Sequence, residues 1–266
     1  MTLSIMLKKL LVKVTPHFIL KYRYLKKKQK LNKFYEGNTV ECTICKSTYR
    51  QFRPYGLIER KNARCPNCNS LERHRLLWKF LHEKTDIMKP KKSIKILHFA
   101  PEPFFYRFFD NVDNVDYFPC DLYPDKYKYQ GNSVIRKVDI TSIPFENDYF
   151  DFILCNHVLE HITDDSLAIS ELYRVMKRNG QGIFQVPIIY SLEQTYEDTS
   201  LTSPEERLKA FGQEDHVRRY GCDYIDRLRL PGFEVIEHDF VKTFSKDELF
   251  KYGFEDHELI YICKKN

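Results

Sequence analysis

From Ile94 to Cys263, short apolar segments alternate with segments of helical periodicity, and this order constrains the fold more than any other feature. Strands are expected at 94–99, 115–121, 134–139, 150–155, 183–186, 233–240 and 259–263. Helices are expected between them at 104–109, 164–176 and 223–230. Apolar strands alternating with helices are typical of parallel sheets covered on both faces. The sequence therefore predicts a doubly wound α/β fold with a mostly parallel, seven-stranded sheet over residues 94–266.

Two Cys-x2-Cys pairs precede this region and predict a small metal-binding segment at 36–90. Cys42 and Cys45 form the first pair, and Cys65 and Cys68 form the second after nineteen intervening residues. Four thiolates from two tight turns match the tetrahedral preference of Zn²⁺, so a closed, structural zinc ribbon is expected. The remaining cysteines are scattered in or beside apolar runs: Cys120, Cys155, Cys222 and Cys263. Free thiols fit a reducing compartment, so a cytoplasmic location is expected.

Charge is divided very unevenly along the chain, although the formal net charge is only +6. Residues 1–95 carry a net charge of +18 and residues 96–266 carry −12. Residues 1–35 hold ten Lys and Arg and no acid, with apolar residues from Leu3 to Val14 at helical spacing. This segment is expected either to contact an anionic surface, at the inner face of a membrane or on RNA, or to pack as an ordinary helix. The longest uncharged run has 14 residues, which excludes a membrane-spanning helix.

Polar residues stand where the predicted strands end. In open α/β sheets, ligands bind outside the carboxyl ends of the strands. Ala100 follows the first strand, Asp121 closes the second, and Asp139 closes the third. Asp121 lies 21 residues beyond Ala100, where an acid can accept hydrogen bonds from a ribose. Asp139 could accept from an adenine amine. The three loops together predict a nucleotide-type cofactor site.

The segment around the fourth strand resembles the class I S-adenosylmethionine (SAM)-dependent methyltransferases, of the methyltransferase type 11 kind. The residues that carry the resemblance are Pro144-Phe145, Asp151, His157-Val158-Leu159-Glu160-His161, Glu171-Leu172, Arg174-Val175-Met176-Lys177 and Gly180. It covers residues 94–187 well and the rest of the domain loosely. The cysteine pairs and the first loop, His98-Phe99-Ala100-Pro101-Glu102, are similar to those of a bacterial subgroup.

The resemblance implies a Rossmann-like methyltransferase domain with SAM across the first four strand ends. It places Glu102 and the backbone of Phe99 and Ala100 near the methionine part of SAM. It places Asp121 at the ribose, Asp139 near the adenine, and Asn156 with His157 beside the sulfonium. The first loop departs from the family because it contains Pro101 and Pro103 and no glycine.

Three histidines are candidates for a catalytic base: His157, His161 and His216. The insert 187–221 is too long for a simple connection and is expected to be a substrate lid. The methyl acceptor is expected to be a small molecule, a glycan or RNA. The alternative is a non-catalytic, methyltransferase-like binding or scaffold protein with a zinc ribbon.

Overall fold

The computed structural model describes residues 17–129 and 131–266, and these form two compact units. The described part of the first unit runs from His17 to Lys79 and resumes at Val241–Asp256. The second comprises Phe80–Phe240 and His257–Asn266. The sequence prediction placed all of 94–266 in one domain, whereas the structure gives Val241–Asp256 to the first unit. Arg75 explains the difference, because its guanidinium binds the backbone of that segment (see below).

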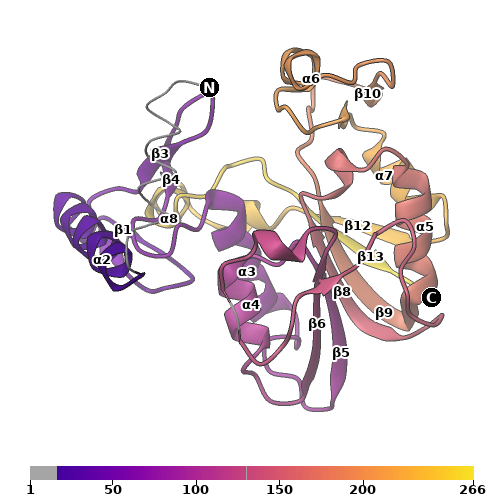
Figure 1. The fold of residues 1–266 in the computed structure, drawn as a ribbon, viewed down its shortest axis with the longest axis horizontal. Coiled ribbons are helices and arrows are strands. Elements are labelled where there is room, and N and C mark those ends of the chain that lie inside the picture. Colours follow the sequence, from indigo (N-terminus) through magenta and orange to yellow (C-terminus); the bar gives the residue numbers. More distant parts are fainter. Residues whose placement is uncertain (1–16, 130) are drawn as a thin grey trace. The chain divides into compact units, whose positions relative to one another are not determined.

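Within residues 80–129 and 131–266, seven strands form one sheet in the order β12-β13-β9-β8-β5-β6-β7 (Figure 1). The strands are β5 (Ile94–Phe99), β6 (Val115–Asp121), β7 (Arg136–Lys137), β8 (Phe150–Asn156), β9 (Met176–Gln185), β12 (Glu234–His238) and β13 (Ile260–Lys264). β5 to β9 run parallel, and β13 is antiparallel to both of its neighbours. The predicted seven-stranded, mostly parallel sheet is confirmed.

Helices cover the two faces of this sheet, with α4 (Pro103–Phe109) and α5 (Asp165–Val175) on opposite sides (Figure 1). α5 and α7 (Tyr224–Arg229) pack their apolar residues into the main core with the strands. α4 packs Phe109 against Tyr117 of β6, with ring centroids 5.7 Å apart. α5 begins where the Asp164 carboxylate accepts the backbone N–H of Leu167, as is typical of an N-cap.

Two strands differ in length from the prediction. The third, expected at 134–139, is the two-residue edge strand β7, since it pairs with β6 only through Arg136 and Lys137. The fifth, expected at 183–186, is the ten-residue β9. Asn179-Gly180 has the residue types of a helix end, but it lies inside β9 because α5 has already ended at Val175.

The insert between β9 and α7 carries local structure of its own. β10 (Tyr196–Glu197) pairs antiparallel with β11 (Arg218–Arg219). Between them lies α6 (Pro204–Phe211), which begins at a capping box formed by Ser203 and Glu206. Short 3₁₀ turns occur at η1 (Pro124–Lys126), η2 (Leu159–His161) and η3 (Phe240–Thr243).

The first unit contains a basic helix, two hairpins and a returning helix. α2 (His17–Phe34) precedes the pair β1 (Val40–Glu41) and β2 (Thr48–Tyr49), and then the pair β3 (Arg53–Tyr55) and β4 (Arg60–Arg64). α3 (Glu72–Lys84) begins in this unit, and α8 (Lys246–Tyr252) closes it. The apolar pattern predicted from Leu3 to Val14 lies outside the described residues. In the part of the chain that the structure describes, no helix is both long and apolar enough to cross a membrane.

Candidate functional site

A cavity of about 410 Å³ lies at the carboxyl ends of β5, β6 and β8. Its volume falls in the range of about 300–1,000 Å³ that is usual for small-ligand pockets. The lining residues are Phe99, Ala100, Asp121, Leu122, Tyr123, Lys126, Val138, Asp139, Ile140, His157, Val158, His161, Ile162 and Asp215. A larger hollow of about 730 Å³ borders Ile94 and Asp151, near the amino ends of β5 and β8. The first cavity is the candidate site, because ligands bind sheets of this kind at the carboxyl ends of the strands.

Two residues that line the cavity adopt left-handed backbone conformations, which are rare for residues other than glycine. Ala100 has φ +48° and His157 has φ +54°. Each follows a strand, β5 and β8, and each turns the chain sharply at the edge of the cavity. A left-handed residue with a Cβ costs about 1–2 kcal/mol. The chain thus makes at Ala100 the turn for which glycine is best suited, at a cost in stability.

Asp121 and Asp139 both line the cavity, and both already accept hydrogen bonds from the protein. The Asp121 carboxylate accepts the backbone N–H of Tyr123 at 2.7 Å and the hydroxyl of Tyr127 at 2.6 Å. Two effects raise the pKa of Tyr127: burial, which is the larger, and the hydrogen bond to the Asp121 carboxylate. Asp139 accepts the N–H and the hydroxyl of Thr141. Each aspartate is therefore held in place, and each carboxylate retains acceptor capacity toward a ligand.

Glu102 and Asn156, predicted in the cofactor site, contact each other and are not among the lining residues in the described chain. Asn156 Nδ2 donates to Glu102 Oε1 at 3.4 Å. The other oxygen of Glu102 lies 2.9 Å from Nε2 of His98, whose side chain is 0% exposed. Nδ1 of His98 lies 2.8 Å from the hydroxyl of Tyr117. This chain of polar groups fixes the first loop to the sheet, and neither His98 nor Tyr117 was predicted to take part.

The three predicted histidines come together around Glu160, a buried residue of η2. Nδ1 of His157 lies 3.2 Å from Glu160 Oε1. The rings of His161 and His216 are 4.8 Å apart and nearly perpendicular. Burial opposes ionisation of Glu160, but the hydrogen bond and charges of the histidines outweigh it, so its pKa lies below the usual value. Burial lowers the pKa of His216. Sequence reasoning missed Glu160, although the spacing His-x2-Glu-His places these groups on one turn.

The charged residues of the insert mostly bind the protein itself. The Arg218 side chain is 3% exposed and donates to the carbonyls of Leu159, Ile162 and Thr163 in the loop after β8. It also pairs with Glu197 at 2.9 Å. The insert is thereby fastened over the loop that holds the histidines, and it brings Asp215 and His216 to the site.

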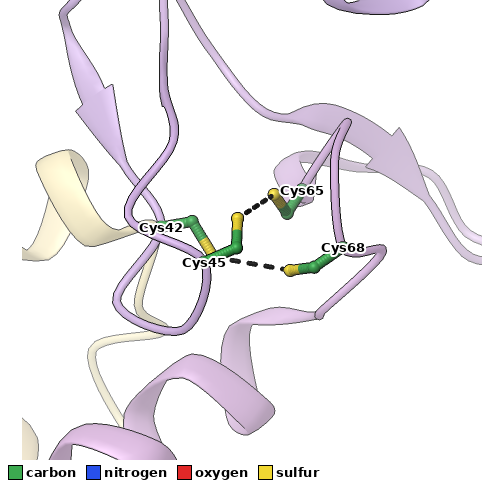
Figure 2. Close-up of side chains that lie close together, drawn as sticks. All are labelled: Cys42, Cys45, Cys65 and Cys68. Atoms are coloured by element: carbon green, nitrogen blue, oxygen red, sulfur yellow. Dashed lines mark hydrogen bonds between the residues drawn. The ribbon is translucent and has the colours of Figure 1, made fainter. Parts of the chain in front are cut away.

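In the first unit, the four predicted metal ligands meet (Figure 2). Cys42 Sγ lies 3.6 Å from Cys68 Sγ, and Cys45 Sγ lies 3.7 Å from Cys65 Sγ. Four sulfurs at 2.3 Å from a tetrahedral zinc ion would be about 3.8 Å apart. Hydrogen bonds from the other three thiols lower the pKa of Cys45, and the bond from Cys42 has the largest effect. Hydrogen bonds with Cys42 and Cys45 raise the pKa of Cys65. The set has the spacing of a metal centre.

The two cysteine turns have the same backbone geometry. In the first, Lys46 N–H donates to the Cys42 carbonyl, and in the second, Asn69 N–H donates to that of Cys65. Lys46 and Asn69 have φ of +59° and +62°. The equivalent turns aim all four thiols at one point, as expected of a zinc ribbon.

Arg75 is a buried cation of this unit, and the sequence did not predict its role. It is 0% exposed, and its guanidinium lies 4.1 Å from the centroid of the Phe52 ring. It donates to four backbone carbonyls, those of Ala63, Ser70, Tyr252 and Gly253. Two of these belong to the ribbon region and two to the returning segment, so one side chain joins both parts of the unit. Burial lowers the pKa of Arg75.

The sheet order and the cavity at the strand ends define the second unit as a Rossmann-like α/β domain of the methyltransferase type. Residues 100–184 match the sequence model of the family described as "Methyltransferase domain". Over this range the chain therefore matches a methyltransferase family, as the resemblance implied. The matched range begins at the left-handed Ala100 and includes Asp121, Asp139 and the loop after β8.

Curated relatives are similar over part of their length. The ubiquinone/menaquinone biosynthesis C-methyltransferase UbiE of Vibrio campbellii is 31% identical over 70 residues, covering 25% of this chain and 27% of that protein. The sterol 24-C-methyltransferase erg6 of Schizosaccharomyces pombe is 26% identical over 127 residues, covering 45% of this chain and 31% of that protein. The chain thus spans less than a third of the length of these relatives.

Among solved structures, YcgJ from Bacillus subtilis aligns with a TM-score of 0.45 and 14% identity, covering 73% of this chain and 99% of that one. A SAM-dependent methyltransferase from Mesorhizobium loti gives a TM-score of 0.45 and 13% identity, covering 71% and 96%.

Proposed function

We propose that this chain is a SAM-dependent methyltransferase whose cofactor binds in the 410 Å³ cavity. One observation carries the proposal: the residues that match the methyltransferase family bring their strand-end loops to the rim of this cavity. The residues fit the cofactor, because the carboxylates of Asp121 and Asp139 lie in a cavity that also has apolar walls, formed by Phe99, Leu122, Val138, Ile140, Val158 and Ile162. Nε2 of His157, buried and without a hydrogen-bond partner in the described structure, is a further polar atom for a ligand.

Each predicted cofactor residue has a role in this proposal. Asp121 accepts from the ribose hydroxyls, and Asp139 accepts from the adenine amine. The turn at Phe99-Ala100 brings backbone close to the ligand. Glu102 and Asn156 position that turn and the end of β8 through their mutual hydrogen bond.

SAM, when bound, supplies a methyl group on a positively charged sulfur. The protein then has to orient the acceptor, exclude water, and remove a proton where the acceptor is weakly acidic. The insert 187–221 serves as the lid over the acceptor. His157, His161 and His216 are the candidate bases, with Glu160 beside them to stabilise an imidazolium.

Replacing Asp121 by Ala is expected to weaken SAM binding at least about tenfold. Hydrogen bonds to charged groups are worth about 1.5–3 kcal/mol each, and about 1.4 kcal/mol corresponds to one decade of affinity. Calorimetric titration with SAM measures the change. Because Asp121 also holds Tyr127, Tyr127→Phe is the matched control for loss of that internal bond, and Asp125→Asn controls for loop charge.

Both controls are expected to bind SAM nearly as tightly as the unaltered protein. Equal affinity in Asp121→Ala and the unaltered protein would show that the ribose is not held there. Absence of SAM binding in the unaltered protein would favour the alternative function, a scaffold that retains the methyltransferase fold.

We further propose that Cys42, Cys45, Cys65 and Cys68 hold one structural Zn²⁺ ion. The sulfur separations support this, since they match a tetrahedral ZnS₄ centre (Figure 2). Four thiolates leave no open position for substrate, so the ion stabilises the fold and takes no part in methyl transfer. Outside this cluster, Cys120, Cys155 and Cys263 are buried free thiols, which supports a reducing, cytoplasmic location.

The proposed acceptor is a small molecule or a glycan. A small molecule is in keeping with the curated relatives, a C-methyltransferase of ubiquinone/menaquinone biosynthesis and a sterol 24-C-methyltransferase. The basic N-terminal segment 1–35 then holds the enzyme at an anionic membrane surface. Its described part, α2, has no acidic residue in its sequence HFILKYRYLKKKQKLNKF. RNA, the other polyanion, is the competing partner.

Deleting residues 1–30, which removes nine cationic residues and keeps Tyr35 in the interior of the first unit, is expected to abolish binding to vesicles that contain phosphatidylserine. Binding by the full chain should fall steeply as salt is raised, because surface charges are screened. Vesicle flotation at low and high salt measures this, with neutral phosphatidylcholine vesicles as the control. Tighter binding to single-stranded RNA than to the vesicles would point to an RNA acceptor, and binding to neither would assign the segment to protein packing.

A further inference from the structure

Beside the cofactor cavity, three side chains form a cluster that the proposed methyl transfer does not by itself explain. Glu160, His161 and His216 each offer one nitrogen or oxygen, and these atoms all lie within 4.8 Å of one another. Glu160 and His161 come from η2, and His216 comes from the insert, 55 residues further along the chain. Two imidazoles and one carboxylate therefore converge from separate segments of the second unit.

One atom of the cluster is conspicuously unsatisfied. Glu160 is 1% exposed, and its Oε2 has no hydrogen-bond partner in the described structure. Leaving a buried charged acceptor unpaired is costly, at more than the 1–3 kcal/mol of a neutral group. Its other oxygen, Oε1, is already bound by His157. The free oxygen thus needs a cation or a donor that residues 17–129 and 131–266 do not provide.

The histidines are held so that nitrogens remain available. Nδ1 of His161 lies 3.1 Å from the backbone carbonyl of Asp215 and donates to it, which leaves Nε2 for another partner. A ligating histidine almost always donates its second nitrogen to a carbonyl or carboxylate in this manner. His216 is 5% exposed and fixed against the His161 ring. His157 plays the same supporting part for the carboxylate of Glu160.

We propose that Glu160, His161 and His216 form a second metal site, for one divalent first-row transition-metal ion. Two imidazoles and a carboxylate suit Zn²⁺, Fe²⁺ or Mn²⁺, and three protein ligands leave coordination positions open. This site differs from the closed four-cysteine centre in both ligands and openness. His161 lines the cavity, so an ion held by this residue would lie beside the space proposed for the cofactor and the acceptor.

This inference rests on the proposed methyl transfer and narrows the acceptor. A metal ion with open positions binds an oxygen and lowers the pKa of a bound hydroxyl. The acceptor would then be an alcohol, phenol or diol, whose oxygen loses its proton and forms the new bond to the methyl carbon as the carbon–sulfur bond breaks. The proton leaves to solvent or to His157, and the sulfur becomes a neutral thioether.

Counting zinc ions per chain by native mass spectrometry, after equilibration of the full-length protein with Zn²⁺ and removal of excess, tests the site. The unaltered protein is expected to hold one more ion than Glu160→Gln or His216→Gln. The ion at the four cysteines and any adventitious ions are counted equally in the unaltered protein and in the variants, so the difference in zinc count reports on this site alone. Glu237→Gln, the same change at an exposed position of β12, is the control and should keep the full count.

Because Glu160 is buried, His161→Asn gives a second test at a half-exposed position, and it too should lose one ion. Equal zinc counts in the unaltered protein and in folded His161→Asn or Glu160→Gln would overturn the proposal. Titration of the same variants with SAM separates the two ideas. SAM binding without the extra ion would leave the methyltransferase proposal standing, and the extra ion without SAM binding would leave only the metal site.

Discussion

Cys65→Ser is expected to release the ribbon metal and to unfold the first unit, while the second unit stays folded. Binding of structural Zn²⁺ to four-ligand sites is worth about 10–16 kcal/mol, which exceeds the stability of most small domains. The apolar cluster around the cysteines is small, formed by Tyr35, Val40, Cys42, Tyr49, Phe52 and Cys65, and two of these residues are themselves ligands. Without the metal, this cluster loses the ion that joins its two cysteine turns. Zinc analysis and limited proteolysis measure both effects.

Cys222→Ser is the matched control, because Cys222 is exposed and lies in the second unit. It should keep its zinc and its resistance to protease. A purified, chelator-free protein without zinc at the four cysteines, or a Cys65→Ser variant whose first unit resists protease as before, would contradict the structural role of the ion.

Arg75→Met is expected to destabilise the first unit by at least about 4 kcal/mol. The substitution keeps most of the side chain's volume but leaves four buried carbonyls without their donor, and each lost partner costs about 1–3 kcal/mol. Water that enters the site will hydrogen-bond some of these carbonyls and reduce the loss, so the expected destabilisation is taken from the lower end of this range, about 1 kcal/mol for each carbonyl. Urea unfolding of the full chain, followed by protease sensitivity of residues 36–79, reports the change.

Arg73→Met is the matched control, two residues earlier in the same helix and only partly buried. It should change the stability by less than about 1 kcal/mol, as is usual for positions outside the core. Similar unfolding midpoints for the two variants would show that Arg75 does not hold the unit together.

The elements predicted correctly are those whose apolar residues repeat at the spacing of a helix or a buried strand. β5, β6, β8 and α5 are buried, regular elements whose apolar pattern is continuous along the sequence. β7 was predicted too long because an edge strand is set by pairing with its neighbour, and only two of its residues pair. The start of β9 was missed because Asn179-Gly180 reads as a helix end in isolation.

The residues of the candidate site that could be predicted are those in short motifs or at the ends of strands. The cysteine pairs predicted the four thiols that come together in the structure, and strand order brought Asp121, Asp139 and His157 to one cavity. Arg75 could not be found in this way, since its partner at Tyr252 is 177 residues away and is a backbone carbonyl, which leaves no side-chain signal. The role of Glu160 likewise depends on His216, which only the folded insert brings near.

The discontinuity of the first unit has a consequence for how the protein is made. The four cysteines leave the ribosome well before the returning segment, since 177 residues separate Arg75 from Tyr252. At about 5–20 residues per second, this delay is roughly 10–35 s. During that interval the nascent ribbon lacks two of the carbonyls that Arg75 binds in the finished protein. Capture of zinc by the nascent chain would hold the ribbon in shape until its last segment is synthesised, and metal supply during translation would then determine the yield of folded protein.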